Sequence, residues 1–289
     1  VPMGIINGNA IYQRMMEWVL DEFDFADPYV DDVIIGSTGN TREELIRNHE
    51  ADLRKVLEKF AKEKLVVNGA KAHLFVESVE FCGHIITCGT RSPAPAKLLS
   101  IQKWEVPSTV SVLRGFLGLT NYYSSYVEDY AKLAALLTAK LQASKEDGKK
   151  GSQKALLWTE EEVEAFEKLK AALAKALSLH HIQVDKPFVL RTDASAYAVG
   201  AVLEQERDGK LVPVCFCSRK LTKTQRNWAP REQETYAIIM ALRKWAGWIG
   251  FQPVLVLTDH KSLEHWTKEH VDTPSGPAAR RGRWHETLV

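Results

Sequence analysis

Apolar residues recur at helical spacing in the first part of the 289-residue chain. Residues 9–23 carry them four positions apart, which predicts a helix. Thr41 and Glu44 have the spacing of a capping box, which predicts the start of a second helix. The expected buried stripe of that helix is Leu45, His49, Leu53, Val56, Leu57 and Phe60.

Residues 24–36, DFADPYVDDVIIG, have the pattern of a strand, a turn and a second strand. Asp31 and Asp32 stand side by side inside this otherwise apolar stretch. Taken alone, the pair favours a solvated turn, because Asp side chains bond nearby backbone groups. The alternative is a pair of Mg²⁺ ligands at the tip of a hairpin, because carboxylate oxygen is the ligand that this ion prefers.

The middle of the chain changes from strand to helix. Residues 64–92 predict strands, with turns at Asn68-Gly69 and at Gly89. From Pro93 to about residue 180 the pattern is helical, with one helix starting at Pro95, an interruption at Pro107 and a break near Asn121.

A polar loop and a further helix complete this middle part. Residues 143–154 contain glycine and four lysines, which favours a solvated linker. Thr159 and Glu162 form a second capping box. The stripe expected to be buried after it is Val163, Phe166, Leu169, Leu173 and Leu177.

Residues from Pro187 onward predict an α/β unit of about 100 residues. Three consecutive strands are expected, with a hairpin turn at Asp208-Gly209. Pro230 suits the first turn of a helix, which is followed by a strand over PVLVLTDHKSL and a short helix.

Three acids of this unit occupy positions where apolar residues are expected. Asp193 and Asp259 end strands, and Glu234 lies on the apolar stripe of the helix. Each one alone is readily explained as a strand-end or cap residue. A core-facing acid costs several kcal/mol unless something pairs with it. Two divalent cations would do so, as in two-metal phosphodiester hydrolysis, and all three acids in this order of elements favour such a site.

The composition limits the partners. Lys plus Arg number 38 and Asp plus Glu 37, so a nucleic-acid surface must be a local patch. The four cysteines form no CxxC pair, which argues against a zinc site and favours reduced thiols and an intracellular location, cytoplasmic or nuclear. We expect no signal peptide and no membrane span, since no charge-free apolar stretch approaches about 20 residues.

Several motifs together resemble a known family. The segments RTDAS, ETYAIIMAL and VLTDHKSL resemble those that carry the catalytic carboxylates of retroviral-type ribonuclease H. VPMGIINGNAIYQRMM resembles the box that precedes YxDD in reverse transcriptases, with Asn-Gly-Asn where Asn-Ala-Pro is usual, and VEFCGHII resembles the primer grip. LRGFLGLTNYYSSYV and LWTEEEVEAFEKLKAAL resemble the thumb. In order and spacing, nearly the whole chain resembles the polymerase–ribonuclease H polyprotein of gypsy-like long-terminal-repeat retrotransposons.

The resemblance implies an α/β (α+β) fold in three parts. Residues 1–92 would be the C-terminal half of a polymerase palm, 93–184 a helical thumb or connection, and 185–289 a ribonuclease H-like domain with a mixed sheet. It also implies that the chain is truncated at both ends, without the upstream polymerase Asp, the fingers and the fourth ribonuclease H acid.

The resemblance assigns roles to individual residues. Asp31 and Asp32 would bind metal in the polymerase site, and Asp193, Glu234 and Asp259 would hold Mg²⁺ or Mn²⁺ in the ribonuclease H site. Tyr29 would lie against the primer end. The other expected nucleic-acid contacts are Gln13, Phe81, Gly83, His84 and Arg114, with Lys97 and Lys103 as further phosphate-binding candidates.

Two functions remain open from the sequence. The first is an enzyme fragment that binds RNA–DNA hybrids and primer–template, does not extend a primer by itself, and cleaves the RNA of a hybrid with Mg²⁺ or Mn²⁺. The second is a catalytically dead, retroelement-derived subunit that binds other protein chains through its truncated surfaces.

Overall fold

The computed structural model describes residues 6–146, 155–250, 252–260, 263 and 284. The chain divides into two compact units, Val1–Cys88 and Gly89–Val289, and each is considered by itself. The predicted boundary near residue 92 lies close to this division, and the boundary at 184/185 stays a prediction.

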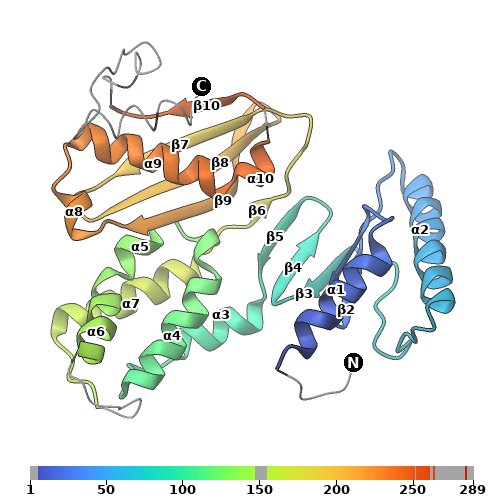
Figure 1. Cartoon of the computed structure of the whole chain (residues 1–289), viewed down its shortest axis with the longest axis horizontal. Coiled ribbons are helices and arrows are strands. Elements are labelled where there is room, and N and C mark those ends of the chain that lie inside the picture. The colour runs from blue at the N-terminus through green and yellow to red at the C-terminus, as the bar shows by residue number, and fades with distance from the viewer. Residues whose placement is uncertain (1–5, 147–154, 251, 261–262, 264–283, 285–289) are drawn as a thin grey trace. The chain divides into compact units, whose positions relative to one another are not determined.

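The first unit combines helices with short antiparallel hairpins. Its elements are α1 (Gly8–Leu20), β1 (Ala26–Tyr29), β2 (Asp32–Ile35), α2 (Arg42–Lys62), β3 (Ser78–Phe81) and β4 (His84–Thr87) (Figure 1). β1 pairs with β2 and β3 pairs with β4, both antiparallel. The expected helix over residues 9–23 and the strand–turn–strand after it are confirmed.

The core of this unit is small. Its fully buried members are Met16, Val19, Leu20, Ala26, Val56 and Phe60. The expected stripe of α2 is only partly correct, because Leu57 is 43% exposed and the stripe residues of the earlier turns are at most half-buried. The Thr41 hydroxyl caps α2 by accepting from the Glu44 N–H, but the Glu44 carboxylate accepts from Asn40 rather than completing the box.

The strand expected from residue 64 is not formed. Residues 63–77 contain a turn in which the Lys71 N–H donates to the Asn68 carbonyl, and no strand before β3. Lys64 and Phe75 adopt positive φ values of 58° and 55°, and Val66 is 96% exposed. The β-branched residues here find no partner strand, and β-propensity without pairing does not produce a strand.

The second unit contains a helical part followed by a four-stranded sheet. The helical part comprises β5 (Thr90–Pro93), α3 (Pro95–Gln102), α4 (Val110–Tyr122), the 3₁₀ turn η1 (Ser124–Tyr126), α5 (Tyr130–Leu133), α6 (Ala135–Glu146), α7 (Glu160–Ala174) and β6 (Leu179–His180). The rest comprises β7 (Phe188–Ala194), β8 (Ala198–Arg207), β9 (Lys210–Lys220), α8 (Lys223–Arg226), α9 (Pro230–Lys244), α10 (Ala246–Ile249) and β10 (Val254–Leu257).

Most helix and turn signals of this unit are confirmed. Pro95 and Pro230 occupy first-turn positions, and the Thr159–Glu162 capping box is complete. The expected linker is wrong at its start, because residues 143–146 continue α6, whose Ser-Lys-Glu sequence is compatible with a helix. Residues 147–154 and the short helix expected near the C-terminus lie outside the described residues.

The sheet has the order β10-β7-β8-β9 and is mixed, as expected. β7, β8 and β9 form an antiparallel meander, and β10 runs parallel to β7. Asp208 and Gly209 make the β8–β9 turn with φ values of 52° and 74°, the left-handed region that Asp tolerates and Gly readily adopts.

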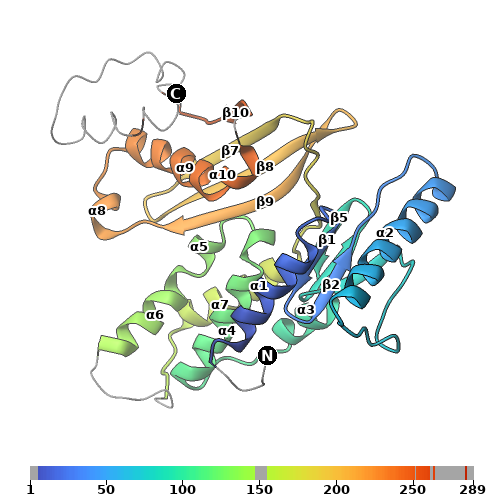
Figure 2. The same ribbon diagram turned by 45° about the vertical axis from the view of Figure 1, so that its right-hand side comes forward.

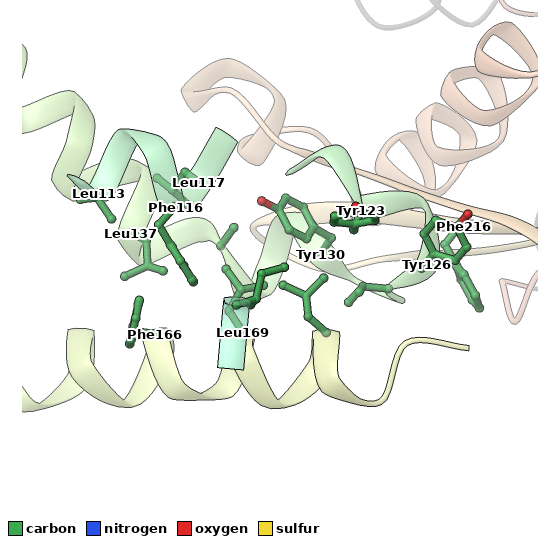
Figure 3. Close-up of a cluster of buried hydrophobic side chains, with 14 of the residues drawn as sticks. Leu113, Phe116, Leu117, Tyr123, Tyr126, Tyr130, Leu137, Phe166, Leu169 and Phe216 are labelled. Atoms are coloured by element: carbon green, nitrogen blue, oxygen red, sulfur yellow. The ribbon is translucent and has the colours of Figure 1, made fainter. Parts of the chain in front are cut away.

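The two faces of this sheet are covered by different helices (Figure 2). Helix α9 packs on one face, where Leu190 and Leu203 meet Ile238. On the other face, Val202 and Phe216 join the core of the helical part (Figure 3). That core includes Leu113, Phe116, Leu117, Tyr123, Tyr126, Tyr130, Leu137, Phe166, Leu169 and Leu173. The helical part and the sheet therefore share one apolar core, which fixes the sheet for the site described next.

The structure bears on two expectations from composition, the state of the cysteines and the membrane span. The four cysteines, Cys82, Cys88, Cys215 and Cys217, all lie within the described residues, and none of them is in a disulfide. Within the described residues, no helix is both long and apolar enough to cross a membrane. The expected location of the protein stays a prediction.

Candidate functional site

The strand ends of β7 and β10 bring two acids to one edge of the sheet. Arg191 of β7 and Leu257 of β10 are register partners in the parallel pair. Asp193 and Asp259 each lie two residues beyond these partners, so both emerge at the carboxyl end of neighbouring strands. The two acids come to the same end of the sheet because the strands pair in parallel. This pairing could not be predicted from the sequence of either strand alone.

Glu234 supplies a third carboxylate from the second turn of α9. It is only 7% exposed, and its Oε1 accepts a hydrogen bond from the Ala194 N–H at 3.1 Å. Among the residues that the structure describes, its Oε2 is buried and has no hydrogen-bond partner. A buried carboxylate oxygen left unpaired is costly, and such exceptions call for a specific explanation.

The charges of Asp193 and Asp259 affect the pKa of Glu234. Burial is the main cause that raises the pKa of Glu234 to about 7, with help from the nearby charges of Asp259 and Asp193 and against the Ala194 hydrogen bond, which lowers it. Asp193 and Asp259 are exposed, so the expectation that all three face the core is wrong for these two. The reason is strand parity, since Phe188, Leu190 and Thr192 are buried on one face of β7, whereas Asp193 lies on the other face, on which Val189 is buried but Arg191 is exposed.

The other expected acids lie at a hairpin tip in the first unit. Tyr29 pairs with Asp32, leaving Val30 and Asp31 as a two-residue turn. Asp31 and Asp32 are exposed. Val30 has a φ of 55°, which is unusual for a β-branched residue.

Gln13 of α1 holds this tip. Its Oε1 accepts from the Val30 N–H at 2.6 Å, and its Nε2 donates to the Pro28 carbonyl at 3.0 Å. The side-chain amide is therefore bonded to the backbone on both sides of Tyr29. The structure gives Gln13 a positioning contact, and its expected contact with nucleic acid stays a prediction.

The second hairpin of this unit lies beside the first. The Tyr29 and Phe81 rings meet edge to face with centroids 6.5 Å apart. Phe81 pairs with His84 across a turn in which Gly83 has a φ of 76°. Burial raises the pKa of the Cys82 thiol and the nearby Asp32 charge raises it further, so this turn is close to the acidic tip. Tyr29, Phe81, Gly83 and His84 are thus brought together with Asp32.

Two family models match the chain. "Reverse transcriptase (RNA-dependent DNA polymerase)" matches residues 1–86, and "RNase H-like domain found in reverse transcriptase" matches residues 158–256. The retrovirus-related Pol polyprotein from transposon opus of Drosophila melanogaster is 35% identical over 273 residues, 91% of this chain. The chain belongs to the reverse transcriptase–ribonuclease H polyproteins of long-terminal-repeat retrotransposons. The expectation of a gypsy-like element is confirmed, since the polyprotein from transposon gypsy is 34% identical over 269 residues.

The retrotransposon relatives are much longer than this chain. It covers 26% of the opus polyprotein and 25% of the gypsy polyprotein. A Tf2-3 polyprotein of Schizosaccharomyces pombe is 30% identical over 268 residues, with 19% of its length covered. The chain therefore spans about a quarter or less of these relatives.

Solved structures share the fold at lower identity. The foamy viral protease-reverse transcriptase in complex with dsDNA matches with a TM-score of 0.80 and 22% identity, over all of this chain and 57% of that chain. The same viral protein in complex with RNA/DNA hybrid matches with a TM-score of 0.79 and 23% identity, over all of this chain and 37% of that chain. These matches support the α/β fold.

Reverse transcriptase and ribonuclease H families generally depend on divalent metals. Among the described residues, no three His, Cys, Asp or Glu side chains are gathered closely enough to hold an ion as they stand. The donor set of Asp193, Glu234 and Asp259 nevertheless fits a hard cation, because all donors are carboxylate oxygens and Oε2 of Glu234 is unpaired.

A cavity of about 150 Å³ lies beside Asp193 on the sheet face opposite α9. Glu128 and Asp129 line it from the segment before α5, together with Arg191. A Cβ built on Gly200 would come within 2.6 Å of Asp129 Oδ1, so any larger residue here would require the Asp129 carboxylate to shift. Asp129 and Gly200 were not predicted from the sequence, in which the available signal was weak, a single glycine within an apolar strand.

The predicted phosphate-binding cations do not line the cavity beside Asp193. Arg114 of α4 and Lys97 of α3 are exposed, as is Lys103 just after α3. Their role stays a prediction.

Proposed function

We propose that the ribonuclease H-like part of this chain hydrolyses the RNA strand of RNA–DNA hybrids with Mg²⁺ or Mn²⁺ held by Asp193, Glu234 and Asp259. The observation that carries the proposal is the buried, unpaired Oε2 of Glu234 at the edge where Asp193 and Asp259 end neighbouring parallel strands. A purely structural role leaves that oxygen unexplained.

Each residue has a distinct part in this mechanism. The Ala194 N–H fixes Oε1 of Glu234, which leaves Oε2 as the free donor. Exposed Asp193 and Asp259 supply charge from the solvent side, where a nucleic-acid backbone has access. Bound divalent cations supply activation of the attacking water and stabilisation of the leaving oxygen.

The raised pKa of Glu234 agrees with this arrangement. Without cations, burial and the two Asp charges favour its protonated form near neutral pH. Cation binding requires the carboxylate form, so binding and loss of the proton are coupled. We therefore expect activity to increase as the pH rises through about 7.

The hairpin of the first unit supports a second activity, nucleotidyl transfer by the whole polyprotein. Asp31 and Asp32 are held exposed at a tip that Gln13 fixes, with Tyr29 against Phe81. In this proposal the two acids belong to the polymerase metal site, and the second hairpin supports the primer strand. The foamy viral protein is in complex with dsDNA in one structure and with RNA/DNA hybrid in another, which agrees with primer–template and hybrid as partners of this family member.

The decisive experiment is cleavage of a labelled RNA–DNA hybrid with Mg²⁺ or Mn²⁺ by the wild-type chain and by Asp193→Asn. Glu206→Gln is the matched control, because Glu206 is an exposed acid on β8 and is not part of the carboxylate cluster of Asp193, Glu234 and Asp259. We expect cleavage by the wild type and the control and none by Asp193→Asn. Equal cleavage by the wild type and Asp193→Asn, or none from either, overturns the proposal and leaves the structural-subunit alternative.

A further inference from the structure

Residues 219–231 form a strongly basic stretch in a chain that is otherwise close to neutral. The stretch contains five cations and no acid, whereas the whole chain has a net charge of +1. The cations are Arg219, Lys220, Lys223, Arg226 and Arg231. A run of like charge is often only a solvated surface, so its position and contacts have to decide its role.

The stretch runs from the end of β9 through α8 into the first turn of α9 (Figure 1). Glu234 lies only three residues beyond it. The β7–β8 turn, which follows Asp193 directly, is tied to the stretch because the Leu221 N–H donates to the Tyr197 carbonyl at 2.8 Å. The basic stretch and the carboxylate cluster therefore occupy the same edge of the sheet.

A buried glutamine fixes α8 against α9. Gln233 is 8% exposed, and its Nε2 donates to the carbonyls of Gln225 and Arg226 at 3.1 and 3.2 Å. Because Gln233 directly precedes Glu234, the backbone of Arg226 is held in a defined position relative to the cluster. A solvated loop would not need this buried amide.

The Arg226 side chain is oriented by an exposed aromatic ring. Its guanidinium lies over the Tyr197 ring, 5.4 Å from the centroid. Tyr197 is 61% exposed and Arg226 is exposed as well. Within the described part of the chain, no ion pair joins Arg226 to a carboxylate.

This pair has the chemistry of a phosphate-binding site. A guanidinium stacked on an aromatic face loses less freedom on binding, and its planar donors match the oxygens of a phosphate. The exposed ring also offers a surface for a sugar or a base.

We propose that Arg226, oriented by Tyr197, binds a backbone phosphate of the nucleic acid and positions the strand over the carboxylate cluster. Arg226 is a positioning residue in this scheme, because it contacts the substrate away from the bond that is cleaved. The inference rests on the proposed function for the identity of the nucleic acid, but binding is measurable without cleavage.

Fluorescence anisotropy with a labelled RNA–DNA hybrid in EDTA tests the binding step, over a salt series from about 50 to 200 mM. We expect Arg226→Ala to weaken binding about five- to tenfold at the lowest salt, and to reduce the slope of log affinity against log salt by about one. Arg226→Lys keeps the charge and therefore the slope, and Tyr197→Phe keeps the ring and binds like the wild type. Tyr197→Ala should weaken binding by about half as much, on a logarithmic scale, as Arg226→Ala.

Arg243→Ala is the matched control, because Arg243 is an exposed cation at the opposite end of α9. It should leave the affinity within about twofold of the wild type. Equal losses for Arg226→Ala and Arg243→Ala, or no change in slope for Arg226→Ala, overturn the inference. Circular dichroism of each variant excludes unfolding, and the loss of affinity expected for Tyr197→Ala but not for Tyr197→Phe keeps the test valid if Arg226→Ala fails to fold.

A parallel cleavage assay separates this inference from the proposed function. If the wild type does not cleave but Arg226→Ala still weakens binding with the lower slope, the inference stands and the proposed activity fails. If the wild type cleaves and Arg226→Ala binds and cleaves normally, the activity stands and the inference fails.

Discussion

The two acidic groups of this chain are built in opposite ways. Asp31 and Asp32 are neighbours in sequence, lie at an exposed two-residue turn and leave no carboxylate buried. Asp193, Glu234 and Asp259 come from two strands and a helix, and one of them is buried with an unpaired oxygen. The geometry of the hairpin acids depends on one turn and on the residue that holds it. The acids assembled from distant segments instead depend on the whole fold, which brings like charges together and buries one of them at a cost in free energy.

The largest effect expected from this contrast is on cleavage. Glu234→Gln should reduce hydrolysis of an RNA–DNA hybrid by about a hundredfold or more, because an amide replaces the buried cation ligand. Asp31→Asn should leave the same rate within about twofold. Single-turnover rates with saturating enzyme measure both, and a rate for Glu234→Gln close to the wild type would remove Glu234 from the site.

The same substitution should stabilise the protein when no divalent cation is present. At pH 8 we expect Glu234→Gln to increase the free energy of unfolding by about 2–3 kcal/mol, because it removes a carboxylate that burial and its acidic neighbours disfavour. Urea denaturation in EDTA measures the difference. The rate and the stability should therefore move in opposite directions.

The stabilisation expected for Glu234→Gln should depend on pH in a defined direction. The fold raises the pKa of Glu234 from 4.5 to about 7, so the fold favours the protonated form. The contribution to stability is fully present below pH 4.5 and is lost as the pH rises through about 7. The gain from Glu234→Gln should vanish below pH 4.5 and reach its full size above pH 7, and a pH-independent gain would rule out this cause.

A smaller effect is expected at the hairpin tip. Gln13→Ala removes the acceptor for the Val30 N–H and the donor to the Pro28 carbonyl, which should cost about 1–2 kcal/mol. Hydrogen exchange should become faster at Val30. Gln183→Ala is the matched control, because Gln183 is an exposed glutamine of the second unit, and it should leave the Val30 exchange rate unchanged. Unchanged exchange at Val30 in Gln13→Ala would show that the amide does not hold the tip.

The smallest effect should come from the turn itself. Val30→Gly should stabilise the hairpin by up to about 1 kcal/mol, because glycine adopts a φ of 55° without the strain of a β-branched side chain. Thermal unfolding monitored for the first unit tests this. A loss of stability would mean that the Val30 side chain makes contacts that outweigh the strain.

Local sequence signals predicted much of the fold. The capping box at Thr159, the prolines at 95 and 230 and the Asp208-Gly209 turn each act through their own neighbours, so their structures follow from sequence. The strand expected from residue 64 does not form, because a strand needs a neighbouring strand to pair with, and the local sequence pattern does not show whether one is present.

The candidate site was predictable only in part. The order of elements carrying Asp193, Glu234 and Asp259 was sufficient to select them, and the hairpin tip followed from its turn. Strand phase explains why Asp193 is exposed while Glu234 is buried. The Tyr197–Arg226 pair depends on the packing of α8 against α9. Such features arise from tertiary packing, which no single segment specifies.

The central claim is that Asp193, Glu234 and Asp259 together bind divalent cations. Electron paramagnetic resonance of Mn²⁺ in titrations of the wild type, Glu234→Gln and an Asp31→Asn/Asp32→Asn variant tests it directly, since free and bound Mn²⁺ give distinct signals. We predict that Glu234→Gln loses bound Mn²⁺ that both the wild type and the hairpin variant retain. Equal Mn²⁺ binding by the wild type and Glu234→Gln would contradict the claim.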